Sequence, residues 1–490
     1  MKFIHNISEC AIAEKSFLAD GERILPYHEL PQIFKTLGTW LDQKGVRTID
    51  GIVLEIENSV LSALLVLFFL EMGYGFLVVQ KQIDNGVALN NDVRYPSFIK
   101  YIVTSVNGVN GGAEDLYNPS RFLSITSNRR WREPGREISL TEKLFLKTSG
   151  STGISKMVRL SHAGILGNAM NTAERIGLTS SDRIVLPVPL FHSYGLTTAF
   201  LSSIVVGASI DLQKGANLLR YLKREKEFQP NVAFLTPVFM EGLVKGGRGA
   251  PHPYRLTISA GDGFRQDMFS LYETQTGPIV NLYGSTEMGA IAAGDPEENM
   301  LIRNRYVGKP MPGVEICVRP CKEAVFSEMC DAGEFWCRHP FRFDCYVDLD
   351  GCALERGPED PEGWFNLKDL GRLSPEGYVQ VLGRSDHSVN RNGSLVFFAD
   401  VERAMQTLPG LENVVMIAKG ESSRGRTLIA CCVPAKGATP SEHTIRQACF
   451  SCLPRNAVPD SIRIIERLPL LPNGKIDRRT LASSIESDGS

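Results

Sequence analysis

The sequence lacks a surplus of charge of either sign. Its 490 residues include 53 lysines and arginines against 55 aspartates and glutamates, a formal net charge of −2. A protein that binds nucleic acid or an anionic membrane over a broad surface usually shows a clear basic excess. We therefore expect neither as a partner, and we expect any anionic ligand to be held by a local site.

Long hydrophobic runs are also missing. The longest, Val60–Leu70, ends at Glu71 and is far shorter than the ~20 residues that span a bilayer. We expect a buried helix there rather than a membrane span. The amino-terminal residues lack the charged-then-apolar layout of a secretory signal, so we expect a cytoplasmic protein.

Paired cysteines are scarce. The eleven cysteines are an odd number in a large chain without a secretory signal, which argues against a disulfide framework. Cys449 and Cys452 have Cys-x2-Cys spacing, but no second pair or histidine partner accompanies them. Zinc binding is therefore not expected.

What the chain does contain is a regular alternation of short and long segments. From about residue 50 to 340, apolar or β-branched runs such as Gly51–Glu55 alternate with helix-length amphipathic stretches such as His162–Ile176. This predicts an α/β fold, with a large domain of mostly parallel sheets and packed helices. Near Gly383 this alternation gives way to a compact pattern of helix-like and strand-like segments that is typical of an α+β unit. We predict domains over residues 1–384 and 385–490.

The most informative stretch is residues 144–162. A short apolar run, Leu144–Leu146, leads into a loop of serine, threonine and glycine that Lys156 closes. Glycine lets backbone N–H groups approach anionic oxygens, hydroxyls add donors and lysine adds a point charge, so the loop suits a polyphosphate. Walker A spacing is absent. Taken alone, the segment is more simply explained as a solvated turn between two strands.

Five further segments lie downstream. They are Pro189–Gly195, Ser259–Gly263, Asn281–Glu287, Gly363–Gly371 with Gly383–Asp386, and Leu471–Arg478. In order and spacing the six segments resemble the signature motifs of the adenylate-forming superfamily, which comprises acyl-CoA synthetases, non-ribosomal peptide synthetase adenylation domains and luciferases. The motif style is closest to acyl- or aryl-CoA ligases. The resemblance implies that ATP and a carboxylic acid form acyl-AMP and pyrophosphate, after which a thiol displaces AMP.

The resemblance also implies which residues bind ATP. The hydroxyl-rich loop and Lys156 would hold the β- and γ-phosphates, Tyr283 would pack on adenine, and Asp369 would accept from the ribose hydroxyls. Taken singly, such a carboxylate is more often a surface or capping residue. The implied set is Thr148, Ser149, Gly150, Ser151, Thr152, Gly153, Lys156, Asn281, Leu282, Tyr283, Gly284, Asp369 and Arg384.

Four residues are implied to act at the reacting groups. Lys475 would bridge the attacking carboxylate and the α-phosphate as charge develops. Thr286 would donate to the α-phosphate, and Glu287 would hold Mg²⁺, a hard cation that prefers oxygen ligands. The ring of His192 would guard the pocket against water.

A rotation of the small carboxy-terminal domain between the two half-reactions is a further property of the resembled family. Asp386 matches the hinge position. Lys475 would face the site for adenylation and leave it for thioester formation. The hairpin around Asn390 and Gly393 would then face the incoming thiol.

The nature of the acid is indicated by two positions. Relatives that activate amino acids carry an aspartate where this chain has His192; a buried ammonium without a counter-charge costs roughly several kcal/mol, so an α-amino acid is disfavoured. Acetate-specific relatives have tryptophan at the position of Gly284, so a medium-chain or aromatic acid is expected. The expected pocket residues are Ser193, Tyr194, Val238, Phe239, Ser259, Gly261 and Met288.

Two questions stay open at this point. The acceptor is coenzyme A or, alternatively, the phosphopantetheine of an acyl carrier protein, because the sequence barely separates them. A different class of function is also open: the chain could be a catalytically silent relative that binds nucleotide or acyl-AMP. The joint presence of Lys475, Glu287 and Asp369 argues against this.

Overall fold

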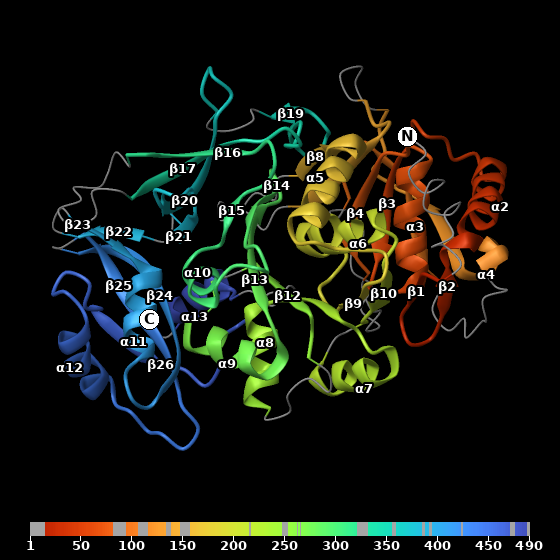
Figure 1. The fold of residues 1–490 in the computed structure, drawn as a ribbon. Coiled ribbons are helices and arrows are strands. Elements are labelled where there is room, and N and C mark those ends of the chain that lie inside the picture. Colours follow the sequence, from red (N-terminus) through yellow and green to blue (C-terminus); the bar gives the residue numbers. More distant parts are fainter. Residues whose placement is uncertain are drawn as a thin grey trace. The chain divides into compact units, whose positions relative to one another are not determined.

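The chain divides into two compact units (Figure 1). Unit 1 contains Met1–Asn304, Met311–Val314 and His339–Gly357, and unit 2 contains Arg305–Pro310, Glu315–Arg338 and Pro358–Ser490. The computed structural model describes residues 15–81, 95–105, 116–133, 139–147, 157–214, 217–246, 253–261, 263–264, 266–320, 332–354, 359–384, 388–391, 394–422, 425–470 and 476–487.

The first sheet of unit 1 has the order β14-β13-β12-β11-β9-β10-β1-β2. Neighbouring strands from β13 to β1 are parallel, whereas β14 and β2 run antiparallel to their neighbours. Strands β10, β11 and β12 are buried along their whole length, as expected for a parallel sheet covered on both faces. The strands are β1 (Phe17–Ala19), β2 (Ile24–Pro26), β9 (Arg183–Leu186), β10 (Ser209–Leu212), β11 (Val232–Leu235), β12 (Leu256–Ala260), β13 (Ile279–Ser285) and β14 (Gly289–Ala293).

The second sheet of unit 1 has the order β19-β18-β8-β7-β4-β3-β5-β6. Its central strands β7, β4, β3 and β5 are parallel, and antiparallel strands flank them on both sides. The strands are β3 (Gly51–Ile56), β4 (Phe76–Gln80), β5 (Ile99–Ser105), β6 (Leu123–Ser127), β7 (Lys143–Lys147), β8 (Met157–Ser161), β18 (Cys345–Val347) and β19 (Ala353–Leu354).

One helix of unit 1 contacts both of its sheets. Helix α5 contacts both β8 and β14. Helix α3 is buried from Val60 to Leu70, which confirms the expected buried helix, and the side chain of Ser59 caps it by accepting from the Ser62 N–H. The helical segments are η1 (Tyr27–Glu29), α2 (Leu30–Gln43), α3 (Val60–Glu71), α4 (Pro119–Phe122), α5 (His162–Arg175), η4 (Tyr194–Phe200), α6 (Leu201–Val205), α7 (Leu218–Phe228), α8 (Pro237–Lys245), α9 (Gln266–Thr276) and α10 (Met300–Arg305).

Unit 2 contains two further sheets. One has the order β16-β17-β20-β21; the other has the order β23-β22-β25-β24, with β26 paired to β25. Alternate residues of β24 and β25 belong to two separate apolar clusters, one with α11 and α12 and the other with α13. The elements are β15 (Lys309–Pro310), β16 (Glu315–Arg319), β17 (Gly333–Arg338), β20 (Phe365–Leu373), β21 (Val379–Arg384), β22 (Ser388–Arg391), β23 (Ser394–Phe397), α11 (Phe398–Gln406), β24 (Leu411–Ser422), β25 (Gly425–Pro434), α12 (Glu442–Cys452), β26 (Ser461–Ile464) and α13 (Arg478–Ser487).

The predicted fold class is confirmed. The predicted strand Gly51–Glu55 is β3, and the predicted helix His162–Ile176 is α5. Among the described residues, no helix combines the length and hydrophobicity that a bilayer crossing requires. The boundary predicted between residues 384 and 385 concerns a moving domain and stays a prediction.

One carboxyl group of unit 1 is buried among tyrosines. Glu225 on α7 is fully buried, and Tyr254 donates a hydrogen bond to its Oε1. The Tyr254 hydroxyl also lies 2.5 Å from that of Tyr221. Burial raises the pKa of Glu225 from 4.5 to about 7. The folded protein therefore keeps this proton at pH values where the unfolded chain has lost it.

We predict that Glu225→Gln flattens the pH dependence of Tm between about pH 4.5 and 7. Because the folded-state pKa lies above the unfolded one, the stabilising contribution is complete below the lower value and is lost as pH rises through the upper one. Calorimetry across this range measures the slope. Glu227→Gln, at a position that is 47% exposed, is the control. An undiminished slope in Glu225→Gln would contradict the assignment.

Candidate active site in unit 1

The carboxyl ends of three parallel strands bring predicted site residues together. Leu235 at the end of β11 is paired with Ser259 on β12, and Ser259 is paired with Asn281 on β13. In open α/β sheets, ligands bind outside this edge. The motif segments that begin at Ser259 and Asn281 therefore start side by side, although the sequence separates them.

The segment that contains Tyr283, the residue expected to pack on adenine, continues from β13 into β14. Tyr283 is half-buried and Gly284 is exposed. A Cβ atom on Gly284 would lie 2.2 Å from the carbonyl oxygen of Gly289 on the opposite strand. Glycine is therefore required by the close approach of the two strands. The close approach of the strands is sufficient to explain why residue 284 is glycine. The glycine is therefore no longer evidence that the acid substrate is large.

The turn between β13 and β14 carries Thr286 and Glu287. The Ser285 hydroxyl accepts a hydrogen bond from the Met288 N–H at 3.1 Å and closes the turn. The carbonyl oxygen of Glu287 accepts from the Phe343 N–H at 2.8 Å. Its carboxylate oxygen Oε1 accepts from the Tyr346 hydroxyl at 2.8 Å. The proposed metal ligand is thus a half-buried carboxylate held in place from two sides.

His192 and Ser193 lie directly before η4, and Tyr194 is its first residue. The His192 ring lies 4.6 Å from the Phe191 ring, centroid to centroid. The Tyr194 hydroxyl is within hydrogen-bond distance of the carbonyl oxygens of Leu235 and Ile258, at 3.1 and 2.9 Å. Burial raises the pKa of Tyr194 well above its usual value, so it stays neutral. Its hydroxyl therefore fastens η4 to the ends of β11 and β12.

The other predicted pocket residues lie in different surroundings. Ser259 and Met288 are buried, Val238 is 46% exposed, and Phe239 packs edge-on against the core residue Tyr221. Ser193 lies beside Thr197, with their side-chain oxygens 3.3 Å apart. Gly261 has φ +101°. None of them lines the apolar pocket of about 240 Å³ between α7 and α8, which is formed by Leu218, Leu219, Leu222, Leu243 and Gly246.

In unit 2, the predicted ribose residues Asp369 and Arg384 face each other across β20 and β21. Arg384 Nη1 lies 3.6 Å from Asp369 Oδ1. Asp369 is 13% exposed and Arg384 43% exposed, so the carboxylate is the more sheltered partner.

Several predicted residues lie outside the described part of the chain. These are the phosphate loop with Lys156, the hinge residue Asp386, Gly393 and Lys475. The strands on either side of the phosphate loop, β7 and β8, are adjacent and antiparallel. Asn390 lies on β22, and its backbone pairs with Leu395 on β23 in the predicted hairpin.

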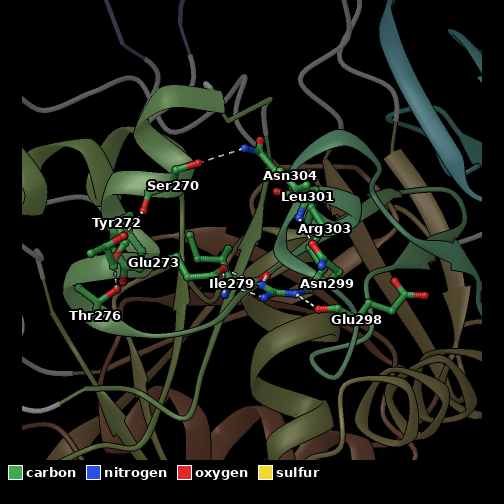
Figure 2. A network of polar contacts seen from close by, with 12 residues as sticks. Ser270, Tyr272, Glu273, Thr276, Ile279, Glu298, Asn299, Leu301, Arg303 and Asn304 are labelled. Carbon is green, nitrogen blue, oxygen red and sulfur yellow. Dashed lines mark hydrogen bonds and ion pairs between the residues drawn. The ribbon is translucent and has the colours of Figure 1, made fainter.

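Arg303 is a positioning residue that the sequence did not indicate. Arg303 is 5% exposed, and its guanidinium binds Glu273 through both amino groups, at 2.6 and 2.8 Å (Figure 2). It also donates to the carbonyl oxygens of Ile279 and Glu298. The Asn281 side-chain amide in turn donates to the Arg303 carbonyl at 3.0 Å. Arg303 thus joins α9 and α10 to the beginning of β13. In the sequence, its role is indicated only by its position after the Asn281 motif.

Comparison with known proteins gives the class. The family model of the AMP-binding enzymes matches residues 144–347, and that of the AMP-binding enzyme C-terminal domain matches residues 400–475. The fold and the motif-bearing strand ends together define the adenylate-forming class. The chain belongs to the AMP-binding enzyme family, as the six motifs predicted.

The individual relatives share only limited sequence identity with this chain. An oxalate–CoA ligase of Arabidopsis thaliana is 28% identical over 69% of this chain and 66% of its own length. Tyrocidine synthase 1 of Brevibacillus parabrevis is 22% identical over 98% of this chain and 45% of its own length. A crystal structure of ATP-bound MatB from Rhodopseudomonas palustris has a TM-score of 0.80 at 19% identity, over 100% of this chain and 99% of that one. The chain thus spans less than two thirds of the first two proteins.

We predict that Arg303→Ala lowers the free energy of unfolding of unit 1 by about 3 kcal/mol, because it leaves the sheltered Glu273 carboxylate unpaired. The KM for ATP should rise more than the KM for the acid, since β13 loses its anchor. Urea unfolding and steady-state kinetics measure these effects. Arg338→Ala, which removes a surface ion pair to Glu315, is the control. Equal effects of the two variants would contradict the role of Arg303.

Proposed function

We propose that the protein is an AMP-forming acid–thiol ligase. The observation that carries the proposal is the turn after β13, where Asn281–Glu287 leaves the carboxyl edge of the sheet with the Glu287 carboxylate oriented by Tyr346. In a member of the AMP-binding enzyme family, this is the arrangement that suits a nucleotide and its metal ion.

In the first half-reaction, a carboxylate oxygen of the acid attacks the α-phosphorus of ATP and pyrophosphate leaves, giving acyl-AMP. Tyr283 would pack on adenine, and Asp369 with Arg384 would bind the ribose. Thr286 and Lys475 would donate to the oxygens on which charge develops. Mg²⁺ bound by Glu287 would neutralise phosphate charge. The loop containing Thr148–Gly153 and Lys156 would hold the β- and γ-phosphates.

In the second half-reaction, a thiolate attacks the acyl carbon and AMP leaves, giving a thioester. His192 beside Phe191 would close the acyl pocket to water, which competes for the same carbon. Rotation about Asp386 would withdraw Lys475 and present the Asn390–Gly393 hairpin to the thiol.

The substrate class is a carboxylic acid without an α-amino group, medium-chain or aromatic. His192 offers no counter-charge for an ammonium, which supports an acid without an α-amino group. The similarity to an oxalate–CoA ligase supports a CoA ligase rather than an amino-acid-activating enzyme. Ser193, Tyr194, Val238, Phe239, Ser259, Gly261 and Met288 are the proposed pocket residues.

Coenzyme A is the proposed acceptor, and a cytoplasmic location is proposed with it. Incubation of the enzyme, ATP and acid with free coenzyme A or with a holo-carrier protein shows which thiol becomes acylated. Thioester on the carrier alone would replace coenzyme A as the acceptor while leaving the ligase activity intact.

The activity itself is tested by carboxylate-dependent exchange of labelled pyrophosphate into ATP, over a panel of short, medium-chain, aromatic and amino acids. We expect exchange with medium-chain or aromatic acids. No exchange with any acid would favour a silent nucleotide-binding relative.

We predict that Lys475→Ala lowers the exchange rate by about 10²–10³-fold, since one cationic donor to the transition state is lost. Thiolysis of preformed acyl-AMP should stay near the wild-type rate. Lys436→Ala, an exposed lysine of the same unit, is the control. An equal loss in both half-reactions would count against the rotating-domain mechanism.

A further inference from the structure

The segment that holds Glu287, residues 343–347, is itself firmly fixed within unit 1. We name it the anchor segment. Its strand β18 pairs antiparallel with β8, with Tyr346 opposite Val158. The neighbouring Asp344 carboxylate lies 2.7 Å from the Lys143 ammonium on β7. The anchor segment is therefore part of the second sheet rather than a loose loop.

Two contacts join the anchor segment to the turn after β13. The Phe343 N–H donates to the Glu287 carbonyl, and the Tyr346 hydroxyl donates to Glu287 Oε1, each at 2.8 Å. The rings of Phe343 and Tyr346 pack edge-on with centroids 4.9 Å apart, which limits the rotation of the phenol.

We propose that Tyr346 is a positioning residue that orients the Glu287 carboxylate toward the metal ion of the metal–ATP complex. This inference rests on the proposed function, in which Glu287 is the metal ligand. The terminal torsion of a glutamate is soft, so a free carboxylate samples many orientations. The phenol has one proton to donate, and it engages Oε1. Oε2 accepts no hydrogen bond from the residues that the structure describes, which leaves it for a cation.

The donor set fits Mg²⁺. This ion is usually held by one or two carboxylates together with phosphate oxygens and water, rather than by a cage of protein ligands. Within the described ranges, no group of three or more histidine, cysteine, aspartate or glutamate side chains gathers as a metal site. A single well-oriented carboxylate such as Glu287 then carries much of the protein's contribution to metal position.

The anchor segment also relates this carboxylate to the predicted phosphate loop. Strand β8 begins directly after that loop, and Met157 and Val158 pair with Val347 and Tyr346. The strand that leaves the phosphate loop is thus the strand that supports the Tyr346 backbone.

Tyr346→Phe tests the inference, because it removes the hydroxyl and keeps the ring that packs on Phe343. We expect Mn²⁺, titrated by electron paramagnetic resonance with a non-hydrolysable ATP analogue, to bind about 10-fold more weakly. In pyrophosphate exchange, the Mg²⁺ concentration for half-maximal rate should rise by a similar factor, and saturating Mg²⁺ should restore the rate.

Tyr27→Phe is the matched control. Tyr27 is fully buried and donates to the Ala208 carbonyl at 2.5 Å, so the same substitution removes a hydrogen bond away from the anchor segment. It should lower Tm and leave Mn²⁺ affinity unchanged. Wild-type Mn²⁺ affinity in Tyr346→Phe, or an equal loss in Tyr27→Phe, would overturn the inference.

Glu287→Gln separates this inference from the proposed function. It should weaken Mn²⁺ binding more than Tyr346→Phe does, and the double variant should bind no more weakly than Glu287→Gln alone. Unchanged Mn²⁺ affinity in Glu287→Gln would overturn the metal role and the inference with it. A loss in Glu287→Gln with none in Tyr346→Phe would overturn the role of Tyr346 alone.

Discussion

The tight pairing of β13 with β14, which leaves no space for a side chain at Gly284, is the constraint on which the candidate site depends. The turn that follows has Gly289 at φ +68°, a conformation that favours glycine. The Asn168 side chain of α5 completes it, because its amide accepts from the Ala290 N–H at 3.0 Å and donates to the Met288 carbonyl at 3.3 Å. The backbone geometry thus fixes the position of the turn between β13 and β14, which carries Thr286 and Glu287.

Three side chains hold this hairpin from three directions. Asn168 reaches it from α5, Arg303 holds the beginning of β13, and Tyr346 holds the carboxylate of the turn. Each makes hydrogen bonds in a buried or half-buried position, where an unmade hydrogen bond is costly. Rigid elements rather than flexible loops therefore orient the groups proposed to meet the nucleotide and its metal ion, which is the kind of support that catalytic positioning needs.

The fold and the motif segments could be predicted because their signals are local. The apolar run of α3 and the alternation around β3 can be recognised in short windows of sequence. Asn168, Arg303 and Tyr346 could not be assigned in this way, since their roles depend on contacts with residues far away in the chain. Gly284 shows a second limit. From the sequence, its lack of a side chain predicts room for substrate, whereas the backbone of β14 occupies that space.

The surroundings of the proposed catalytic lysine indicate what kind of movement its role requires. Leu470 forms a β-bridge with Ile476, so the two ends of the segment that contains Lys475 lie together. A little further on, Arg478 binds the Glu402 carboxylate of α11 and the Met416 carbonyl of β24, at 2.8 and 2.6 Å. The Arg478 contacts thus hold the beginning of α13 to α11 and β24. If Lys475 withdraws between half-reactions as proposed, movement of α11, β24 and α13 as one body would preserve these contacts, which suits the domain rotation of the proposed mechanism.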